Sequence, residues 1–276
     1  MKTVGIVACS NPQPEASRVQ NETLAAFFKN TGSRVLVSPW IYEGTGNLLC
    51  SGKQRADALM QLFQNPEVTD IFDISGGDLA NEVLDYLDFS AIAESKDLFW
   101  GYRDLTTVIN AIYAKTGKSS VLYPVKNLVR GETAEQQRKW FREGEPLFSP
   151  RIRMLRGKEM EGVLVGGNLR CLLKLAGTPY FPDMAGKILL LEARSGRVPQ
   201  MITYLSQLRS LGVFQRLSGI LLGTFSQMEA EGCAPDMASL IRQFAGDSLP
   251  MGKTGEIGHG QDAKAAMIGK KIQISE

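Results

Sequence analysis

Short apolar runs alternate with amphipathic segments over the first 145 residues, and this alternation constrains the fold more than any other feature. Five apolar runs are predicted strands: 3–9, 35–37, 69–74, 98–101 and 119–123. The intervening segments are predicted helices: 19–32, 51–63, 80–87, 105–112 and 132–141. Such alternation predicts an α/β fold with a parallel sheet, in which functional groups gather at the carboxyl ends of the strands.

A Pro-rich and then basic stretch, 146–160, follows this region and is interpreted as a connector. Beyond it, strands are predicted at 162–167, 187–191 and 219–225, and helices at 168–175, 198–208 and 236–244. The chain end, 266–275, is predicted to form a strand or a hairpin. The sequence therefore predicts a second α/β region after the connector.

The bulk composition is that of a soluble globular protein, with 43% hydrophobic and 22% charged residues in a chain of 276. A net charge of +2 gives little reason to expect a nucleic-acid or membrane partner. The four cysteines form no C-x-x-C pair and the histidine is single, so we expect no metal site and no cofactor. With no signal-like or membrane-length apolar run, we expect a cytoplasmic protein.

His259 is the only histidine and lies in Glu-Ile-Gly-His-Gly (256–260), so chemistry that needs a histidine has one place to occur. A lone histidine is nevertheless more often structural than catalytic. Glu192 ends the apolar run 189–191, where a functional acid and a merely solvated one are about equally expected.

Two glycine-containing turns follow predicted strands. In Ser-Gly-Gly-Asp (75–78), Gly76 and Gly77 present N–H groups suited to an oxyanion or phosphate, although a tight turn with Asp78 capping a helix fits equally well. Gly-Tyr-Arg-Asp-Leu-Thr (101–106) has the form of a nucleophile elbow, which exposes its central side chain and directs the next amide at a reacting carbonyl. An ordinary βα turn, with Asp104 capping the next helix, is the competing interpretation.

The order of these motifs is more specific than any one of them. Reading Gly-Gly-Asp (76–78), Gly-Tyr-x-Asp-x-Thr (101–106), Leu-Glu (191–192) and Ile-Gly-His-Gly (257–260), the chain resembles the LD-carboxypeptidases, serine peptidase family S66. Further similar segments extend the resemblance almost end to end: 55–68, 166–169, 177–180, 188–192, 219–223 and 267–269. The segment 75–88 is more similar to the microcin C immunity branch than to the murein tetrapeptide-cleaving branch.

The resemblance implies a flavodoxin-like N-terminal domain, 1–147, a smaller C-terminal α/β domain, 160–276, and an active site between them. It implies hydrolysis of an amide beside a carboxylate-bearing residue in a small peptide or peptidyl-nucleotide, through an acyl-enzyme and without metal. It also implies a homodimer.

A Ser-His-Glu triad is likewise implied. His259 aligns with the base, Glu192 with the acid that orients it, and the Gly76–Asp78 turn together with the Asp104 amide aligns with the oxyanion hole.

The nucleophile position of that triad is Arg103 instead of serine. A guanidinium is always protonated, offers only donors and has no lone pair for attack. Loss of a triad nucleophile costs several orders of magnitude in rate. We expect Arg103 to pair with Glu192 or Asp78.

Three interpretations follow. The chain is a degenerate, non-hydrolytic binder that anchors a ligand carboxylate on Arg103, or an active serine-type carboxypeptidase of murein peptides in which Arg103 is an altered residue. In the third, the His–Glu pair works with water or a substitute nucleophile, for which Cys9, Ser10 and Ser75 are the candidates if they reach His259. Specificity is expected in loops 39–50, 124–131 and 226–235.

Overall fold

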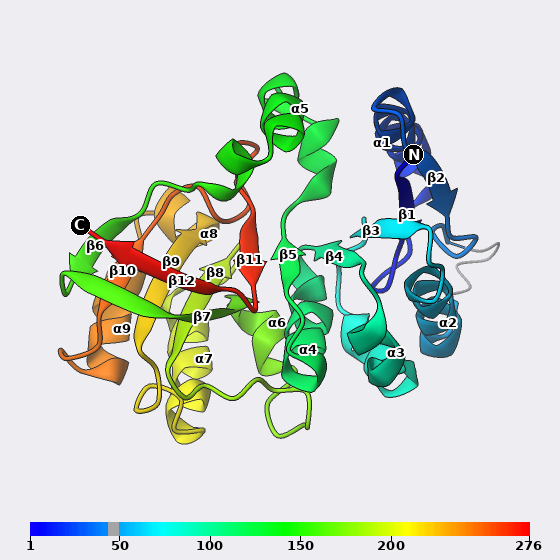
Figure 1. The fold of residues 1–276 in the computed structure, drawn as a ribbon. Coiled ribbons are helices and arrows are strands. Elements are labelled where there is room, and N and C mark those ends of the chain that lie inside the picture. Colours follow the sequence, from blue (N-terminus) through cyan, green and yellow to red (C-terminus); the bar gives the residue numbers. More distant parts are fainter. Residues whose placement is uncertain (44–49) are drawn as a thin grey trace.

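Two six-stranded sheets form the molecule, which the computed structural model describes over residues 1–43 and 50–276 (Figure 1). Residues 44–49 of the predicted specificity loop 39–50 therefore lie outside the described residues. The N-terminal sheet has the order β11-β5-β4-β3-β1-β2. Its strands are β1 (Thr3–Val7), β2 (Arg34–Val37), β3 (Val68–Asp73), β4 (Leu98–Gly101), β5 (Ser120–Leu122) and β11 (Ala266–Ile268).

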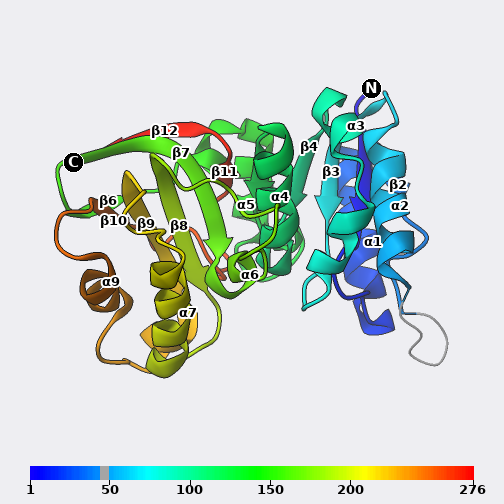
Figure 2. The same cartoon turned by 90° about the horizontal axis from the view of Figure 1, so that it is seen from below.

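Five of these strands are parallel and follow the order 2-1-3-4-5, which is the flavodoxin-like order. α-Helices cover both faces of the sheet, as the two apolar clusters on its sides and Figures 1 and 2 show. One cluster includes residues of α1 (Arg18–Asn30) and α5 (Ala134–Glu143); the other includes residues of α2 (Gly52–Phe63), α3 (Phe89–Glu94) and α4 (Thr106–Thr116). Ser51 and Gln54 form a capping box that begins α2, where the sequence predicted a helix over 51–63.

The C-terminal sheet has the order β12-β7-β8-β9-β10-β6, with four parallel strands between two antiparallel edges. Its strands are β6 (Arg153–Arg156), β7 (Glu159–Asn168), β8 (Lys187–Ala193), β9 (Gly219–Phe225), β10 (Met251–Lys253) and β12 (Lys271–Ser275). Its helices are α6 (Leu169–Leu173), α7 (Val198–Ser210), α8 (Ser226–Ala230) and α9 (Met237–Ala245). The predicted α/β class, with a flavodoxin-like domain and a smaller α/β domain, is confirmed.

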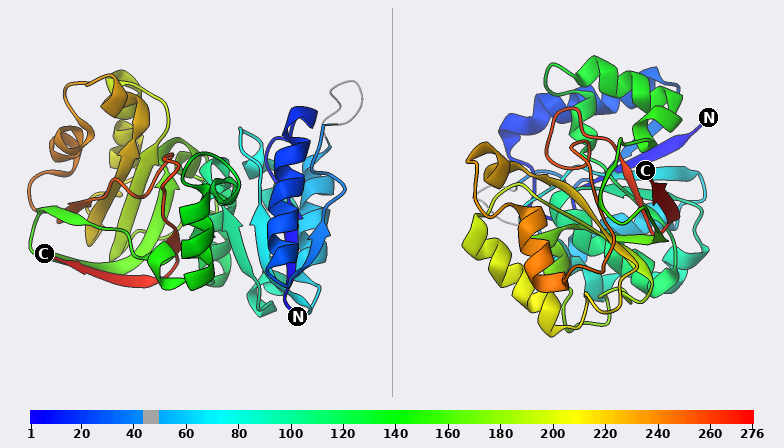
Figure 3. Two further views of the ribbon diagram at one scale, coloured as in Figure 1. Left: turned by 90° about the horizontal axis from the view of Figure 1, so that it is seen from above. Right: turned by 90° about the vertical axis from the view of Figure 1, so that its left-hand side faces the viewer.

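The helix predicted at 80–87 is present as a 3-10 helix, η2 (Ala80–Tyr86). Two other local predictions were wrong. Part of the basic stretch in the expected connector is the edge strand β6. The segment 266–275 is not a hairpin, because β11 pairs with β5 and β12 pairs with β7 in the other sheet. Figure 3 shows these two strands, in red, on either side of the boundary between the sheets. The chain end thus ties the two sheets together.

Three apolar clusters account for the packing. One lies between the N-terminal sheet and α1 and α5, and one packs the C-terminal sheet on α6, α7 and α9. The third joins α2, α3 and α4 to residues of the C-terminal sheet, so it spans both sheets. Over residues 1–43 and 50–276, no helix has the length and apolarity needed to cross a membrane.

Candidate active site

The carboxyl ends of β1, β3, β4 and β5 open on a cavity of about 410 Å³. Its walls come from the loops that follow these strands, and Arg194 and His259 complete it from the C-terminal region. This location follows from the topology, because ligands of open α/β sheets bind beyond the carboxyl ends of the strands, where the strand order reverses. Here that reversal lies between β1 and β3.

Glu192 and His259 form a hydrogen-bonded pair beside this cavity. The Glu192 Oε2 atom lies 2.8 Å from His259 Nδ1, and its Oε1 accepts from Asn168 Nδ2 at 3.0 Å. The Tyr102 hydroxyl lies 3.0 Å from His259 Nδ1 and 3.3 Å from Glu192 Oε2. We assign the proton of the neutral imidazole to Nδ1, facing the carboxylate, which leaves Nε2 as an acceptor able to take a proton.

The direction of the Glu192 side chain follows from strand register at the end of β8. The β8–β9 register shifts between Leu191 and Ala193, and such an irregularity re-aims the intervening side chain. Asn168 of β7 is the register partner of Glu192, which explains why its amide reaches the carboxylate. Glu192 is fully buried, so each of these hydrogen bonds replaces one that water would have made.

The loop that carries His259 is held from both sides. Gly258 has φ of 150°, and a Cβ there would lie 1.8 Å from Thr224 Oγ1, so glycine is required. From the N-terminal domain, Asn127 Nδ2 donates to the carbonyl oxygens of Gly260 and Gln261, at 2.9 and 3.1 Å. The imidazole is therefore positioned by contacts from both domains.

Arg103 has the backbone of an elbow. It is the only non-glycine residue of the described chain with positive φ, at 56°, and it begins the 3-10 helix η3 (Arg103–Leu105) after β4. Its half-buried side chain lines the same cavity as His259. Burial, and then the neighbouring guanidinium of Arg194, lower the pKa of Arg103.

The expected ion pair of Arg103 with Glu192 or Asp78 was wrong. Glu192 is already bonded to Asn168, Tyr102 and His259, as described above, and the Asp78 carboxylate pairs with Arg170 of α6. Within the described residues Arg103 makes no ion pair with any carboxylate.

Asp104 serves as a buried link between the domains. Its carboxylate accepts from Ser10 Oγ at 2.7 Å and from the Ala80 amide at 2.8 Å, and it pairs with Lys174, which follows α6. The competing interpretation, in which Asp104 caps the following helix, is therefore wrong for its side chain: α4 begins without a side-chain cap. The residue after Arg103 is thereby fixed to both halves of the molecule.

Of the residues expected to form an oxyanion hole, only Gly76 lines the cavity. Gly77 has φ of 126°, and a Cβ there would lie 2.3 Å from the Asn11 side chain. The Asp78 amide donates to Asn11 Oδ1 at 2.8 Å, so it is already bonded. The turn is thus a packed junction as well as a cavity wall.

The three substitute nucleophiles all bond to groups other than His259. Cys9 is fully buried, and burial together with Asp73 raises the pKa of its thiol well above the usual range. Ser10 Oγ donates to Asp104, and Ser75 Oγ donates to Asp73 at 2.5 Å. Each side chain is thereby held in a structural hydrogen bond or kept protonated, which argues against the use of Cys9, Ser10 or Ser75 as a nucleophile.

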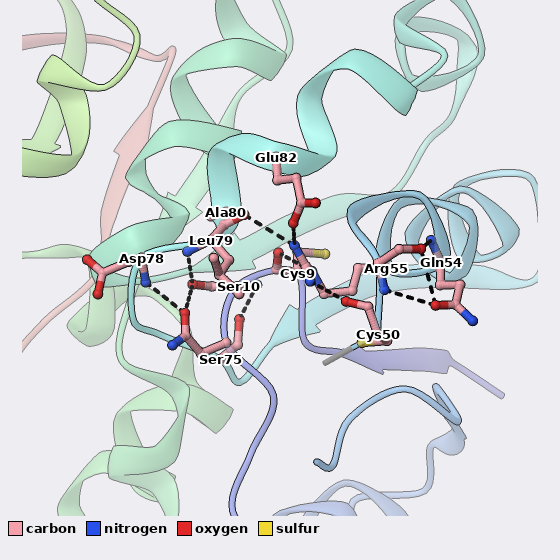
Figure 4. Close-up of polar contacts among 12 residues, drawn as sticks. Cys9, Ser10, Cys50, Gln54, Arg55, Ser75, Asp78, Leu79, Ala80 and Glu82 are labelled. Carbon is pink, nitrogen blue, oxygen red and sulfur yellow. Dashed lines mark hydrogen bonds and ion pairs between the residues drawn. The ribbon is translucent and has the colours of Figure 1, made fainter. Parts of the chain in front are cut away.

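A buried arginine organises these strand ends (Figure 4). Arg55 of α2 is 1% exposed and donates to the carbonyl oxygens of Cys9, Cys50 and Leu79 at 3.2, 2.6 and 3.4 Å. It also pairs with Glu82, which is half-exposed. The segment after β1 and the start of η2 are therefore fixed relative to each other.

Sequence reasoning assigned no individual role to several residues that the structure brings to the site, although two of them, Lys126 and Arg130, lie in the expected specificity loop 124–131. Tyr102 and Asn168 contact the Glu192–His259 pair, and three cations line the cavity: Lys126, Arg130 and Arg194. A partial signal existed for four of them, because Tyr102, Asn168, Lys126 and Arg194 lie within three residues after a predicted strand. Only their side-chain directions were missing from the sequence.

Comparison with known proteins gives the family. Residues 4–123 match the LD-carboxypeptidase N-terminal domain, and residues 161–274 match the LD-carboxypeptidase C-terminal domain. The "Probable murein peptide carboxypeptidase" of Bacillus subtilis is 28% identical over 99% of this chain and 88% of its own length. The microcin C7 self-immunity protein MccF of Escherichia coli is 25% identical over 80% of this chain and 75% of its own length.

Solved structures show the same fold. MccF in complex with glutamyl sulfamoyl guanosine superimposes with a TM-score of 0.87 at 20% identity, over 99% of this chain and 93% of that one. A muramoyltetrapeptide carboxypeptidase from Oxalobacter formigenes gives a TM-score of 0.82 at 24% identity, over 100% and 95%. With both domains matched in order and a common fold, the chain belongs to the LD-carboxypeptidase family.

Proposed function

We propose that this chain is an LD-carboxypeptidase family member with little or no hydrolytic activity, and that it binds a small peptide or peptidyl-nucleotide through a carboxylate held by Arg103. The observation that carries the proposal is Arg103 itself, which has the positive φ of an elbow and opens on the cavity lined by His259. The position expected to hold a nucleophile therefore holds a cation. A guanidinium donates hydrogen bonds in a fork that matches a carboxylate and cannot attack a carbonyl.

The intact Glu192–His259 pair supports descent from a hydrolytic ancestor. A carboxylate that orients an imidazole is useful for removing a proton from a nucleophile, and this pair has a hydrogen bond of 2.8 Å. Without a hydroxyl at residue 103, its free nitrogen faces a cavity and no attacking group. The contacts of Cys9, Ser10 and Ser75 argue against a substitute.

The ligand class is supported by the relatives. Structures of MccF contain glutamyl sulfamoyl guanosine, aspartyl sulfamoyl adenosine and adenosine monophosphate. Curated relatives are named for murein peptides. Both kinds of compound bear anionic groups, which suits a cavity that Arg103 lines.

The test is to install the missing hydroxyl. We expect Arg103→Ser to hydrolyse either a murein tetrapeptide or an aminoacyl-adenylate analogue at least about 10³-fold faster than the native protein, because the base and its orienting acid are in place. Arg103→Ala is the matched control, since it removes the guanidinium without adding a nucleophile. A fluorophosphonate probe should label only the serine variant.

Family-like hydrolysis by the native protein would overturn the proposal and favour an active carboxypeptidase. Native activity that is lost in Cys9→Ala would point to the third interpretation, a shifted mechanism. An inactive Arg103→Ser variant that keeps the native circular dichroism spectrum would show that the elbow no longer supports acyl transfer.

A further inference from the structure

Four cationic side chains line the cavity: Arg103, Lys126, Arg130 and Arg194. The one carboxylate in its wall belongs to Asp73, which is buried and accepts hydrogen bonds from the Cys9 amide and from the amide and hydroxyl of Ser75. Across residues 1–43 and 50–276, no ion pair involves any of the four cations. The cavity therefore has a positive charge that its own walls do not neutralise.

We group the four cations in two pairs by the elements that carry them: Lys126 and Arg130 both follow β5, whereas Arg103 follows β4 and Arg194 follows β8. Among the charged neighbours of Arg103, Arg194 has the strongest effect on its pKa, which is lowered chiefly by burial. Burial, followed by the nearby charge of Arg130, lowers the pKa of Lys126 to about 8. Like charges that share one cavity destabilise one another unless an anion lies between them.

In the pair that follows β5, Lys126 is held on a firm part of the fold, whereas Arg130 is exposed. Lys126 lies in η4 (Val125–Leu128), directly after β5, and its ammonium donates to Gln13 Oε1 in the loop after β1. Asn127, the next residue, ties η4 to the loop that carries His259. The ammonium is therefore held at the carboxyl ends of the strands and is half-buried there.

We propose that Lys126 and Arg130 form a second anion subsite, and that the cavity takes a small ligand with two anionic groups. The inference rests on the proposed function, which places a first carboxylate at Arg103; the subsite adds a second group, a carboxylate or a phosphate, at the other pair. Charge-assisted hydrogen bonds in a partly buried site are strong and specific for such groups. A volume of about 410 Å³ is within the usual range for small-ligand sites.

Four acetylated dipeptides separate the possibilities when their binding to the native protein is measured by calorimetry at pH 7. Acetyl-Ala-Gln and acetyl-Ala-Ala have one carboxylate, acetyl-Ala-Glu has two, and acetyl-Ala-phosphoserine adds a phosphate instead. We expect the ligands with two anionic groups to bind roughly 10- to 100-fold more tightly than acetyl-Ala-Gln. If acetyl-Ala-Glu binds more tightly than acetyl-Ala-phosphoserine, the second group is a carboxylate; if the phosphoserine peptide binds more tightly, it is a phosphate.

Variants locate the effect. Lys126→Gln and Arg130→Gln should each reduce the preference for acetyl-Ala-Glu over acetyl-Ala-Gln, and the double variant should abolish it. Arg153→Gln is the matched control, because it removes one exposed cation from the edge strand β6, away from the cavity. Circular dichroism checks that each variant is folded.

A second measurement needs no variant. Because the pKa of Lys126 is about 8, half of the Lys126 side chains carry the proton at pH 8. An anion beside the side chain would raise that pKa. Acetyl-Ala-Glu should therefore bind with uptake of up to about half a proton, measured by calorimetry in buffers of different ionisation enthalpy. Acetyl-Ala-Gln should take up fewer protons.

Equal affinities for acetyl-Ala-Glu and acetyl-Ala-Gln, together with a weak phosphoserine peptide, would overturn the second subsite. So would a preference that survives in the double variant, or no binding by any of the four peptides. Equal affinities, or a preference that survives in the double variant, would leave the gain of hydrolysis expected for Arg103→Ser unaffected. Conversely, a hydrolytically active native protein would defeat the proposed function and leave the ligand preference to be judged by itself.

Discussion

The two sides of the cavity differ in how fully their functional groups are satisfied. On the C-terminal side, the Glu192 carboxylate has three protein partners and His259 is fixed against it. On the N-terminal side, the elbow keeps its backbone conformation, but the guanidinium at its tip has no carboxylate partner in the described chain. The comparison teaches that the backbone that positions a group and the chemistry of that group are separable.

The elbow persists because its surroundings fix it independently of its tip. The residue after Arg103, Asp104, is held by Ser10, by the Ala80 amide and by Lys174 from the other domain. A change at residue 103 leaves this buried link in place, whereas loss of the link would leave a buried charge without its partner. The conformation of the turn therefore does not depend on whether residue 103 is a nucleophile.

The largest effect expected from this comparison is on the C-terminal side. Glu192→Ala should lower the free energy of unfolding by about 2 to 4 kcal/mol, because it leaves the buried groups of Asn168 and Tyr102 without an acceptor. Urea denaturation followed by circular dichroism measures the change. Glu192→Gln is the control: it keeps the volume and one acceptor, so its loss should be smaller.

A loss below about 0.5 kcal/mol for Glu192→Ala would mean that water replaces the carboxylate freely. The hydrogen bonds of the Glu192–His259 pair would then add no more stability than the Arg103 side of the cavity has, and the contrast between the two sides would not hold.

On the N-terminal side of the cavity we expect a substitution at residue 103 to increase stability. Arg103→Gly should raise the free energy of unfolding by about 1 kcal/mol, because glycine adopts a φ of 56° without the steric cost that other residues meet there. Arg103→Ala separates the two contributions, since it removes the guanidinium while keeping the unfavourable backbone conformation. If glycine destabilises the fold relative to alanine, the backbone at 103 is not strained.

The sequence predicted most of this arrangement where local pattern determines the structure. The strands that end at Val7, Asp73 and Gly101 were recognisable as apolar runs, and the parallel order placed their carboxyl ends together. The resemblance to a family then paired Glu192 with His259 across 67 residues of sequence, and the structure joins them at 2.8 Å.

The errors concern contacts that no local pattern encodes. The pairing of Arg103 was wrong because the partners available to Asp78 depend on where α6 packs, and α6 belongs to the other domain. The role of Asp104 was missed for the same reason, since Lys174 is 70 residues away. Residues 266–275 were predicted to form a strand or a hairpin because they are adjacent in sequence, although β11 and β12 join different sheets.

The smallest predicted effect concerns Lys126, whose charge bears on both sides of the comparison. Its pKa is lowered to about 8 by burial, then by Arg130, with Asp73 acting in the opposite direction and Arg103 adding to the lowering. The unfolded chain holds this proton up to about pH 10.4, so between these values the unfolded state binds more protons than the folded state. The contribution of Lys126 to stability therefore rises with pH over that interval, and its cost is fully present below pH 8.

Lys126→Met lacks this cost, so we expect it to be more stable than the native protein at pH 7, by less than about 1 kcal/mol for a half-buried group. The advantage should shrink as the pH rises from 8 to 10, measured as the difference between urea-denaturation free energies. Lys29→Met, at an exposed position of α1, should show no such trend. A difference that is constant with pH would show that the folded protein does not disfavour the Lys126 charge. It would also argue against the inference that the cavity walls leave its positive charge unneutralised.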